Sequence, residues 1–236
     1  MDVPVIDKEH ARRVDELAVD HYGIEIIQMM ENAGRHVAEL AKKMIKDVHD
    51  KNIVLLAGKG NNGGDALVAA RFLANWGANC TVIFAEEEDK LHELTKKQAE
   101  ILKVMDIIPL GPSDETRFYE IFDKAHIIID GLLGYNIRGD PEDVYGRLIQ
   151  LANDVGKHVL SIDVPSGLDP DTGMPYNPCI KAKATICLAN VKKGCLEGKE
   201  YAGDIYAADI GLPPALYDIL GIEVGYMFSE KDIIKI

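Results

Sequence analysis

The pattern that most constrains the fold is an alternation of short apolar segments with longer amphipathic ones. Strands rich in β-branched and apolar residues are predicted at 53–57, 80–85, 107–110, 126–130, 158–163 and 184–189. Helices are predicted between them at 64–76, 91–105, 115–124 and 144–155. Strands that are apolar on both faces and alternate with helices imply a parallel sheet covered on both sides. The predicted fold class is therefore α/β, a three-layer α-β-α arrangement with a doubly wound, mostly parallel, Rossmann-like sheet.

The two ends of the chain add to this pattern. Apolar side chains recur at helical spacing through residues 11–48 and predict two helices broken near Gly23. The tail from Gly194 onward carries Gly, Pro and short β-like pieces, which predict edge strands. A length of 236 residues is typical of one α/β core, so we expect residues 1–236 to form a single domain.

Composition excludes several classes of partner. The formal net charge of -13 disfavours non-specific attraction to nucleic acid or to anionic lipid. Residues 1–13 lack the apolar core of a signal peptide, and no apolar run approaches the roughly 20 residues that span a bilayer. The four cysteines form no C-x-x-C pair and are interpreted as reduced packing residues. We expect a cytoplasmic protein with no nucleic-acid or membrane partner.

The first informative segment reads Ala-Gly-Lys-Gly-Asn-Asn-Gly-Gly-Asp over residues 57–65, between a predicted strand and a predicted helix. Glycines let the backbone approach a ligand, and a helix N-terminus offers unpaired N–H groups, so a phosphate-bearing ligand is expected here. A plain tight turn would leave the two asparagines unexplained. The candidate contacts are Asn61, Asn62, Gly63, Gly64 and Asp65.

The same segment leaves a second interpretation open. The spacing Gly58-x-Gly60-x-x-Gly63 satisfies the dinucleotide fingerprint, and Glu86 follows the next strand as a candidate ribose-binding acid. An NAD(P)-dependent oxidoreductase is therefore one alternative, although no Tyr-x-x-x-Lys pair or His/Asp hydride-transfer set is apparent.

Two further segments place acids at predicted strand ends. Asp130 enters a glycine-rich loop in which Arg138 is a candidate phosphate partner, although Asp130 also suits a helix cap. Asp163 ends an apolar strand, where partial desolvation suits a carboxyl group to general acid/base work. Because the carboxyl ends of parallel strands meet at one edge of a sheet, we expect the three segments to converge.

A cation site is predicted from the same residues. The carboxylate of Asp130, the side-chain oxygen of Asn62 and the hydroxyl of Ser166 are hard oxygen ligands without a thiolate or imidazole cluster. Such a set suits a weakly bound alkali ion or calcium better than zinc.

These motifs, in this order, resemble the NAD(P)HX epimerase family. The specific elements are Asn-Asn-Gly-Gly-Asp at residues 61–65 and Asp-x-Pro-Ser-Gly-x-Asp at residues 163–169, and Met-Glu-Asn-Ala-Gly-Arg at residues 30–35 extends the match. The family has a Rossmann-like domain that is often fused in bacteria to an NAD(P)HX dehydratase. The dehydratase half is not expected in this chain, and a separate dehydratase is the expected functional partner. Relatives include the apolipoprotein A-I-binding protein and scaffold domains without catalysis.

The resemblance implies an isomerase that interconverts the R and S forms of hydrated NADH or NADPH. It implies a potassium ion held by Asn62, Asp130 and Ser166, and Asp163 as the catalytic acid/base. The implied substrate contacts are Asn61, Asn62, Gly63, Gly64, Asp65, Gly134, Tyr135, Asn136, Ile137, Arg138, Gly139, Asp140 and Asp163.

Two departures from the family pattern stand out. Tyr135-Asn136 replaces the usual Thr-Gly, and the stretch around Lys192 and Lys193 differs from the usual Lys-Pro-Lys-like sequence, which leaves both roles open. A non-catalytic nucleotide-binding scaffold is the second alternative to the epimerase. Apolar residues of the N-terminal helices, Ile26, Met29 and Met30, suggest a face for a second subunit, so a homodimer is expected.

Overall fold

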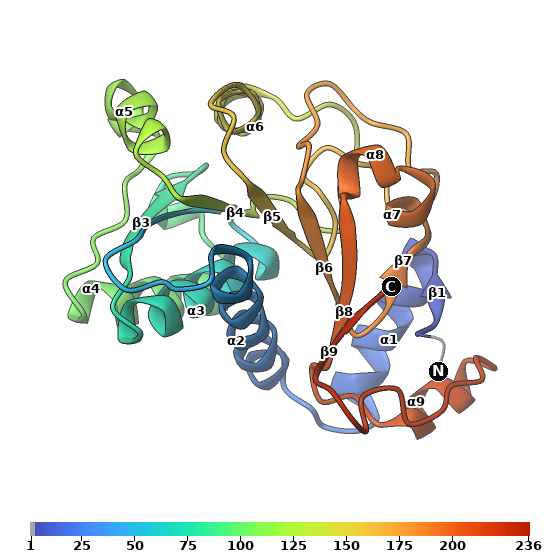
Figure 1. Ribbon diagram of the computed structural model, residues 1–236. Coiled ribbons are helices and arrows are strands. Elements are labelled where there is room, and N and C mark those ends of the chain that lie inside the picture. The colour runs from blue at the N-terminus through green and yellow to red at the C-terminus, as the bar shows by residue number, and fades with distance from the viewer. Residues whose placement is uncertain (1–2) are drawn as a thin grey trace.

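The computed structural model describes residues 3–236 and is built around a twisted seven-stranded sheet (Figure 1). The strand order is β3-β2-β4-β5-β6-β8-β9, and every neighbouring pair is parallel except β8 and β9. The strands are β2 (Asn52–Ala57), β3 (Asn79–Phe84), β4 (Ile127–Gly131), β5 (Val159–Ile162), β6 (Ala184–Leu188), β8 (Asp204–Ala208) and β9 (Ile233–Lys235). The predicted mostly parallel sheet is confirmed. The tail adds β8 and β9 to it, and β9 is the edge strand.

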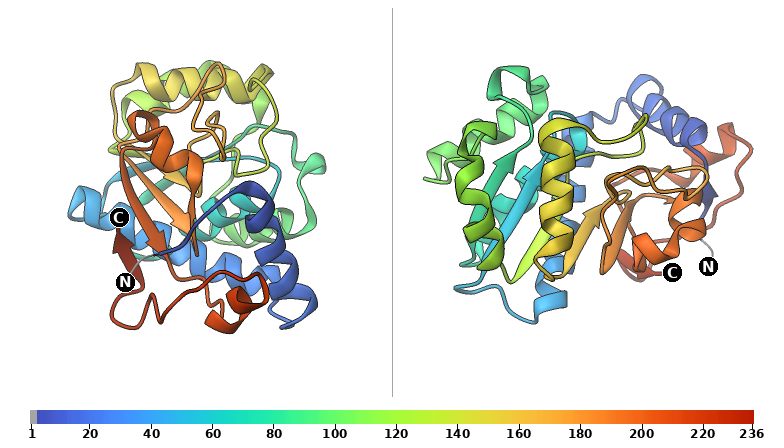
Figure 2. Two further views of the ribbon diagram at one scale, coloured as in Figure 1. Left: turned by 90° about the vertical axis from the view of Figure 1, so that its right-hand side faces the viewer. Right: turned by 90° about the horizontal axis from the view of Figure 1, so that it is seen from above.

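Helices cover both faces of the sheet (Figures 1 and 2). On one face lie α2 (Ile26–Ile45), α3 (Asn61–Asn75) and α4 (Glu93–Val104); on the other lie α5 (Phe118–Asp123) and α6 (Asp143–Asp154). Each face has its own apolar core, because the strands of a parallel sheet are buried on both sides. The three-layer arrangement follows from this double burial.

A third group of elements gathers beside the C-terminal strands. It contains β1 (Val5–Ile6), α1 (Lys8–Asp20), β7 (Val191–Lys192), α7 (Lys193–Glu197), α8 (Lys199–Ala202) and α9 (Pro214–Ile219). In the figures the N-terminal β1 and α1 lie next to β7 and α9, far away in sequence. Strand β1 pairs in parallel with β7, with Ile6 opposite Lys192. The start of the chain therefore fixes a segment that lies almost two hundred residues later.

One predicted strand is wrong. Residues 107–110 form no strand, and only Leu110 makes an isolated parallel bridge, to Ile83 of β3. Pro109 lacks the N–H group that a ladder needs, and Ile108 is exposed. The segment leads instead into the short 3₁₀ helix η2 (Pro112–Arg117); a second one, η1 (Glu88–Lys90), follows β3.

Two predicted boundaries shift in ways that matter for the site. Helix α3 begins at Asn61, with Gly60 as its N-cap, so the Asn-Asn-Gly-Gly sequence forms the first helical turn instead of a loop. Strand β5 ends at Ile162, and Asp163 turns away with a φ of 67°. The predicted break near Gly23 is confirmed, because α1 ends at Asp20 and α2 begins at Ile26.

Within residues 3–236 no helix is long and apolar enough to cross a membrane. Residues 1–13 were predicted to lack the apolar core of a signal peptide, and the first two of them lie outside the described residues. The single-domain organisation stays a prediction.

Helices α2 and α3 pack so closely at Gly34 that a side chain has no room. A Cβ atom there would lie 2.4 Å from Cβ of Val68 and 2.7 Å from the backbone oxygen of Asp65. We expect Gly34→Leu to lower the free energy of unfolding by about 2–3 kcal/mol, since overpacking forces backbone shifts. Urea denaturation measures this. Gly225→Leu is the control, because nothing lies within 4 Å of its Cβ position; equal effects of both substitutions would contradict the packing argument.

Candidate active site

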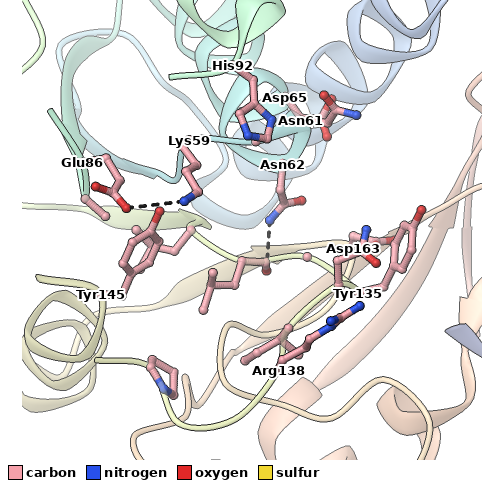
Figure 3. A pocket seen from close by; sticks show the side chains of 18 of the residues that line it. Lys59, Asn61, Asn62, Asp65, Glu86, His92, Tyr135, Arg138, Tyr145 and Asp163 are labelled. Atoms are coloured by element: carbon pink, nitrogen blue, oxygen red, sulfur yellow. Dashed lines mark hydrogen bonds and ion pairs between the residues drawn. The ribbon is translucent and has the colours of Figure 1, made fainter. Parts of the chain in front are cut away.

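A cavity of about 1200 Å³ lies where the strands of the sheet end at their carboxyl sides (Figure 3). The segments that follow β2, β3, β4, β5 and β6 all contribute to its lining. The predicted contacts that line it are Asn61, Asn62, Asp65, Gly134, Tyr135, Asn136, Ile137, Arg138, Gly139, Asp140 and Asp163. The predicted convergence of three strand-end segments is therefore present in the structure.

The glycines near the start of α3 serve packing more than ligand contact. A Cβ atom on Gly58 would lie 1.9 Å from the backbone oxygen of Leu132, and one on Gly63 would lie 2.0 Å from the backbone oxygen of Gly58. Gly63 and Gly64 do not line the cavity, and a Cβ on Gly64 would contact the methyl group of Met30. Close approach here is thus between protein segments, which removes much of the case for a dinucleotide fingerprint.

Glu86 lies on the cavity wall after β3, where the oxidoreductase alternative required a ribose-binding acid. Its carboxylate pairs with Lys59 at 3.8 Å and with Lys90 at 3.4 Å. Glu86 is therefore held between two ammonium groups of residues that also line the cavity.

Asp163 is buried at the opposite end of the cavity, and its side chain is held by two groups. Asp163 has a positive φ, and its side chain lies at the end of β6, where the Leu188 backbone N–H donates to Oδ1 at 3.3 Å. The ammonium group of Lys192 forms an ion pair with the same oxygen, and only 6% of the Asp163 side chain and 4% of that of Lys192 are exposed. A non-glycine residue at positive φ persists only where the surroundings hold it.

Lys192, whose role the sequence left open, is the partner of Asp163. Its ammonium group also donates to the backbone oxygens of Leu188 at 3.1 Å and Asn190 at 3.4 Å. Burial opposes its charge, but the negative charge of Asp163 outweighs this, so the pKa of Lys192 is raised. Lys193 is exposed on the first residue of α7. No local sequence signal distinguishes the two lysines; their difference is set by the pairing of β1 with β7.

Tyr135 and Asp15 form a second contact that the sequence did not predict. The Tyr135 hydroxyl donates to Oδ2 of Asp15 at 2.6 Å and so ties the loop after β4 to helix α1. The ring of Tyr135 lies 5.8 Å from the ammonium group of Lys192. Burial raises the pKa of the Asp15 carboxyl, while the hydrogen bond from Tyr135 acts against this shift. The departure from Thr-Gly therefore places an aromatic side chain in the cavity wall.

Asp65 completes the group of acids around the cavity. It lies in the second turn of α3 with 5% exposure and lines the cavity, above Asp163 and Tyr135 in the view of Figure 3. Burial, then the charges of Asp163 and Asp15, raises the pKa of Asp65 well above its usual value. Asp65 was predicted as a substrate contact, but sequence alone gave no sign of this burial.

The three predicted cation ligands meet around the backbone of Leu133, behind the cavity wall. Ser166 Oγ donates to Asp130 at 2.6 Å and accepts from the Leu133 N–H at 2.9 Å, and Asn62 Nδ2 lies 3.2 Å from the Leu133 oxygen. Asp130 also accepts from the hydroxyl of Ser161 at 2.8 Å. Burial raises the pKa of Asp130, although its hydrogen bonds favour the anion.

The carboxylate and hydroxyl oxygens of this cluster are of the kind that a hard monovalent cation prefers, whereas the Asn62 amide directs its nitrogen, not the predicted oxygen, toward the Leu133 oxygen. A fully buried carboxylate, a hydroxyl, an amide and a backbone oxygen lie together, and no ammonium or guanidinium group is hydrogen-bonded to Asp130 within residues 3–236. Across the same residues no three His, Cys, Asp or Glu side chains gather as a metal-binding group.

Comparison with known proteins identifies the family. A model described as YjeF-related protein N-terminus matches residues 26–194. A protein of Dehalogenimonas lykanthroporepellens named NAD(P)H-hydrate epimerase is 35% identical over 90% of this chain and 84% of its own length. The chain belongs to the NAD(P)H-hydrate epimerase family.

One further relative and one solved structure extend the comparison. A bifunctional NAD(P)H-hydrate repair enzyme of Hyperthermus butylicus is 37% identical over 81% of this chain, which spans 36% of that longer protein. The crystal structure of yeast ynu0 has a TM-score of 0.86, with 24% identity, and covers 99% of this chain and 100% of the yeast chain. The match to ynu0 supports the three-layer fold over the full described length.

The buried ion pair of this family member yields a direct test. We expect Lys192→Met to lower the free energy of unfolding by about 3–5 kcal/mol, because it leaves the buried Asp163 carboxylate without its partner. Urea denaturation measures the loss, and the neighbouring Lys193→Met, on an exposed side chain, is the matched control. If the two variants are equally stable, the ion pair contributes nothing to folding.

Proposed function

We propose that the chain is an isomerase, an NAD(P)H-hydrate epimerase that interconverts the R and S forms of hydrated NADH or NADPH. The observation that carries the proposal is Asp163, a buried carboxylate fixed by Lys192 at the end of a cavity large enough for a dinucleotide. Relatives that share most of the chain bear this name, which supports the same conclusion.

Substrate binding would use both sides of the cavity. The first turn of α3, with Asn61 and Asn62, presents unpaired backbone N–H groups that favour a phosphate. Arg138, in the loop after β4, lines the same cavity and supplies a guanidinium group for a second phosphate contact. Local contacts of this kind explain how a chain with a net charge of -13 holds an anionic ligand.

The chemistry requires proton movement and no redox change. The substrate carries a hydroxyl on a ring carbon next to nitrogen, so epimerisation requires the C–O bond to loosen toward an iminium or a ring-opened form. A carboxylate held at a fixed position beside this carbon can accept or return the proton of the hydroxyl. Asp163 is the group that the cavity positions for this work.

A potassium ion is proposed as the cofactor, held by Asn62, Asp130 and Ser166 together with the backbone oxygen of Leu133. When bound, it would supply positive charge beside the loop that follows β4. The buried Asp130 carboxylate and its oxygen neighbours suit this role.

Other expectations stay proposals. We propose a cytoplasmic protein that works with a separate NAD(P)H-hydrate dehydratase, since several relatives are named as bifunctional repair enzymes. A homodimer is also proposed, but its original reason is wrong: Met29 and Met30 are buried within the chain and Ile26 lines the cavity, so they are not free to contact a second subunit.

Asp163→Asn tests the assignment directly. We expect kcat for epimerisation of R-NADHX to fall by roughly 10²–10⁴-fold, the usual contribution of a positioned acid or base. The amide oxygen still accepts from Lys192, but the Lys192 charge is left uncompensated and lowers stability, so the variant is first shown to be folded by circular dichroism. Binding to the folded variant is expected to persist. Chromatography of the two epimers measures turnover, and calorimetric titration measures binding.

Three outcomes separate the alternatives. Oxidation of the nicotinamide by the wild-type protein would support the oxidoreductase, and binding without chemical change would support the scaffold. Near-normal epimerisation by Asp163→Asn would remove that residue from its role.

The cation proposal has its own test. We expect epimerase activity to fall when potassium is replaced by tetramethylammonium at constant ionic strength. Asp130→Asn should raise the half-activating potassium concentration at least tenfold, about 1.4 kcal/mol in binding free energy, since it removes the formal charge of the ligand set. Ser161→Ala is the control, because Ser161 bonds to Asp130 but is not a proposed ligand. Indifference of the wild-type enzyme to potassium would contradict the proposal.

A further inference from the structure

Three carboxyl groups line the inner part of the cavity, and they have unequal partners. Asp163 has the ammonium group of Lys192 and the Leu188 N–H. Asp15 has the hydroxyl of Tyr135. The side chain of Asp65 has no hydrogen-bond or ion-pair partner among residues 3–236, although it is 5% exposed.

The balance of charge decides which of these groups keeps a proton. Three ionised carboxylates beside one ammonium would leave two uncompensated negative charges in a buried site, which is costly. Lys192 neutralises Asp163 through direct contact, and a neutral hydroxyl stabilises Asp15. Asp65 has neither, so it is the group for which the neutral acid costs least. The raised pKa described above agrees with this order.

The positions of Asp65 and Asp163 are complementary. Asp65 belongs to α3, which covers one face of the sheet, whereas Asp163 follows the carboxyl end of β5. In the view of Figure 3, Asp65 lies above Asp163, on a different element of the cavity wall. A ring bound between α3 and the end of β5 would have one carboxyl group on either element.

We propose that Asp65 is a second catalytic residue, a neutral acid that protonates the departing hydroxyl of the hydrated ring while the Asp163 carboxylate acts at the opposite face. This role deepens the proposed epimerase function and rests on it. It differs from the role of a substrate-binding contact, which is all that the sequence assigned to Asp65.

The step balances without a further reactant. The Asp65 proton passes to the ring hydroxyl, the C–O bond breaks, water leaves, and the nitrogen lone pair forms the iminium. The oxygen of a water molecule then forms a new C–O bond at the other face of the same carbon, which inverts the configuration. This water gives one proton to Asp163. Asp65 is left ionised and Asp163 protonated, the state that catalyses the reverse direction; proton exchange through water restores the first state.

The test compares kinetics across pH. In the wild-type enzyme we expect kcat to fall on the alkaline side, because the acid form of Asp65 is lost as pH rises through its raised pKa. In Asp65→Asn we expect kcat to drop by roughly 10²-fold or more, KM to change less than about threefold, and the alkaline fall to disappear. Asp20→Asn, on an exposed residue at the end of α1, is the matched control and should retain wild-type behaviour.

A second readout does not depend on activity. Carboxyl ¹³C NMR of aspartate-labelled protein, with Asp65→Asn to assign the signal, follows the protonation of Asp65 directly. We expect this signal to titrate well above the usual aspartate range in the ligand-free protein. Titration in the ordinary range would overturn the proposal even if the enzyme is an active epimerase.

The kinetic outcomes distinguish the role of Asp65 from the epimerase function itself. An Asp65→Asn variant with raised KM and unchanged kcat would make Asp65 a binding residue only and overturn the proposal while leaving the epimerase intact. A folded wild-type protein that does not exchange the epimers would overturn the proposed function, and the role of Asp65 with it.

Discussion

The buried ion pair between Asp163 and Lys192 is the interaction on which the site depends. It joins the end of β5 to β7, and β7 is itself held by its parallel pairing with β1 at the start of the chain. Removing either charge would leave the other uncompensated in a buried environment, which costs several kcal/mol. The pair therefore links the position of the reactive carboxylate to the correct docking of the N-terminal segment.

Around this pair, local contacts decide how each acidic side chain is stabilised, and the net charge of the chain does not. The acids in this region have different means of stabilisation: an ammonium group for the buried Asp163, a phenolic hydroxyl for the half-buried Asp15 and hydrogen bonds from serines for the buried Asp130. Asp65 lacks such a partner, and the neutral form is its remaining option. Chemically equivalent side chains thus acquire different roles from their surroundings.

Close packing of backbone segments sets the walls of the cavity. Gly58 and Gly63 allow the loop after β2, the first turn of α3 and the segment after β4 to lie in direct contact. The same contact brings Asn62 beside Leu133, and Leu133 beside Ser166. Two glycines of the dinucleotide fingerprint, Gly58 and Gly63, are thus required by contacts between protein segments, whereas Gly60 lines the cavity.

The sequence by itself determined the alternation of strands and helices, the parallel sheet and the convergence of Asn62, Asp130 and Asp163, because periodicity and strand order are local properties whose consequence for sheet edges is general. The tertiary structure alone decided that Lys192 and not Lys193 meets Asp163, that Tyr135 contacts Asp15, and that Asp65 is buried without a partner. The two contacts join residues 29 and 120 positions apart, and the third feature is burial, and a local pattern encodes neither.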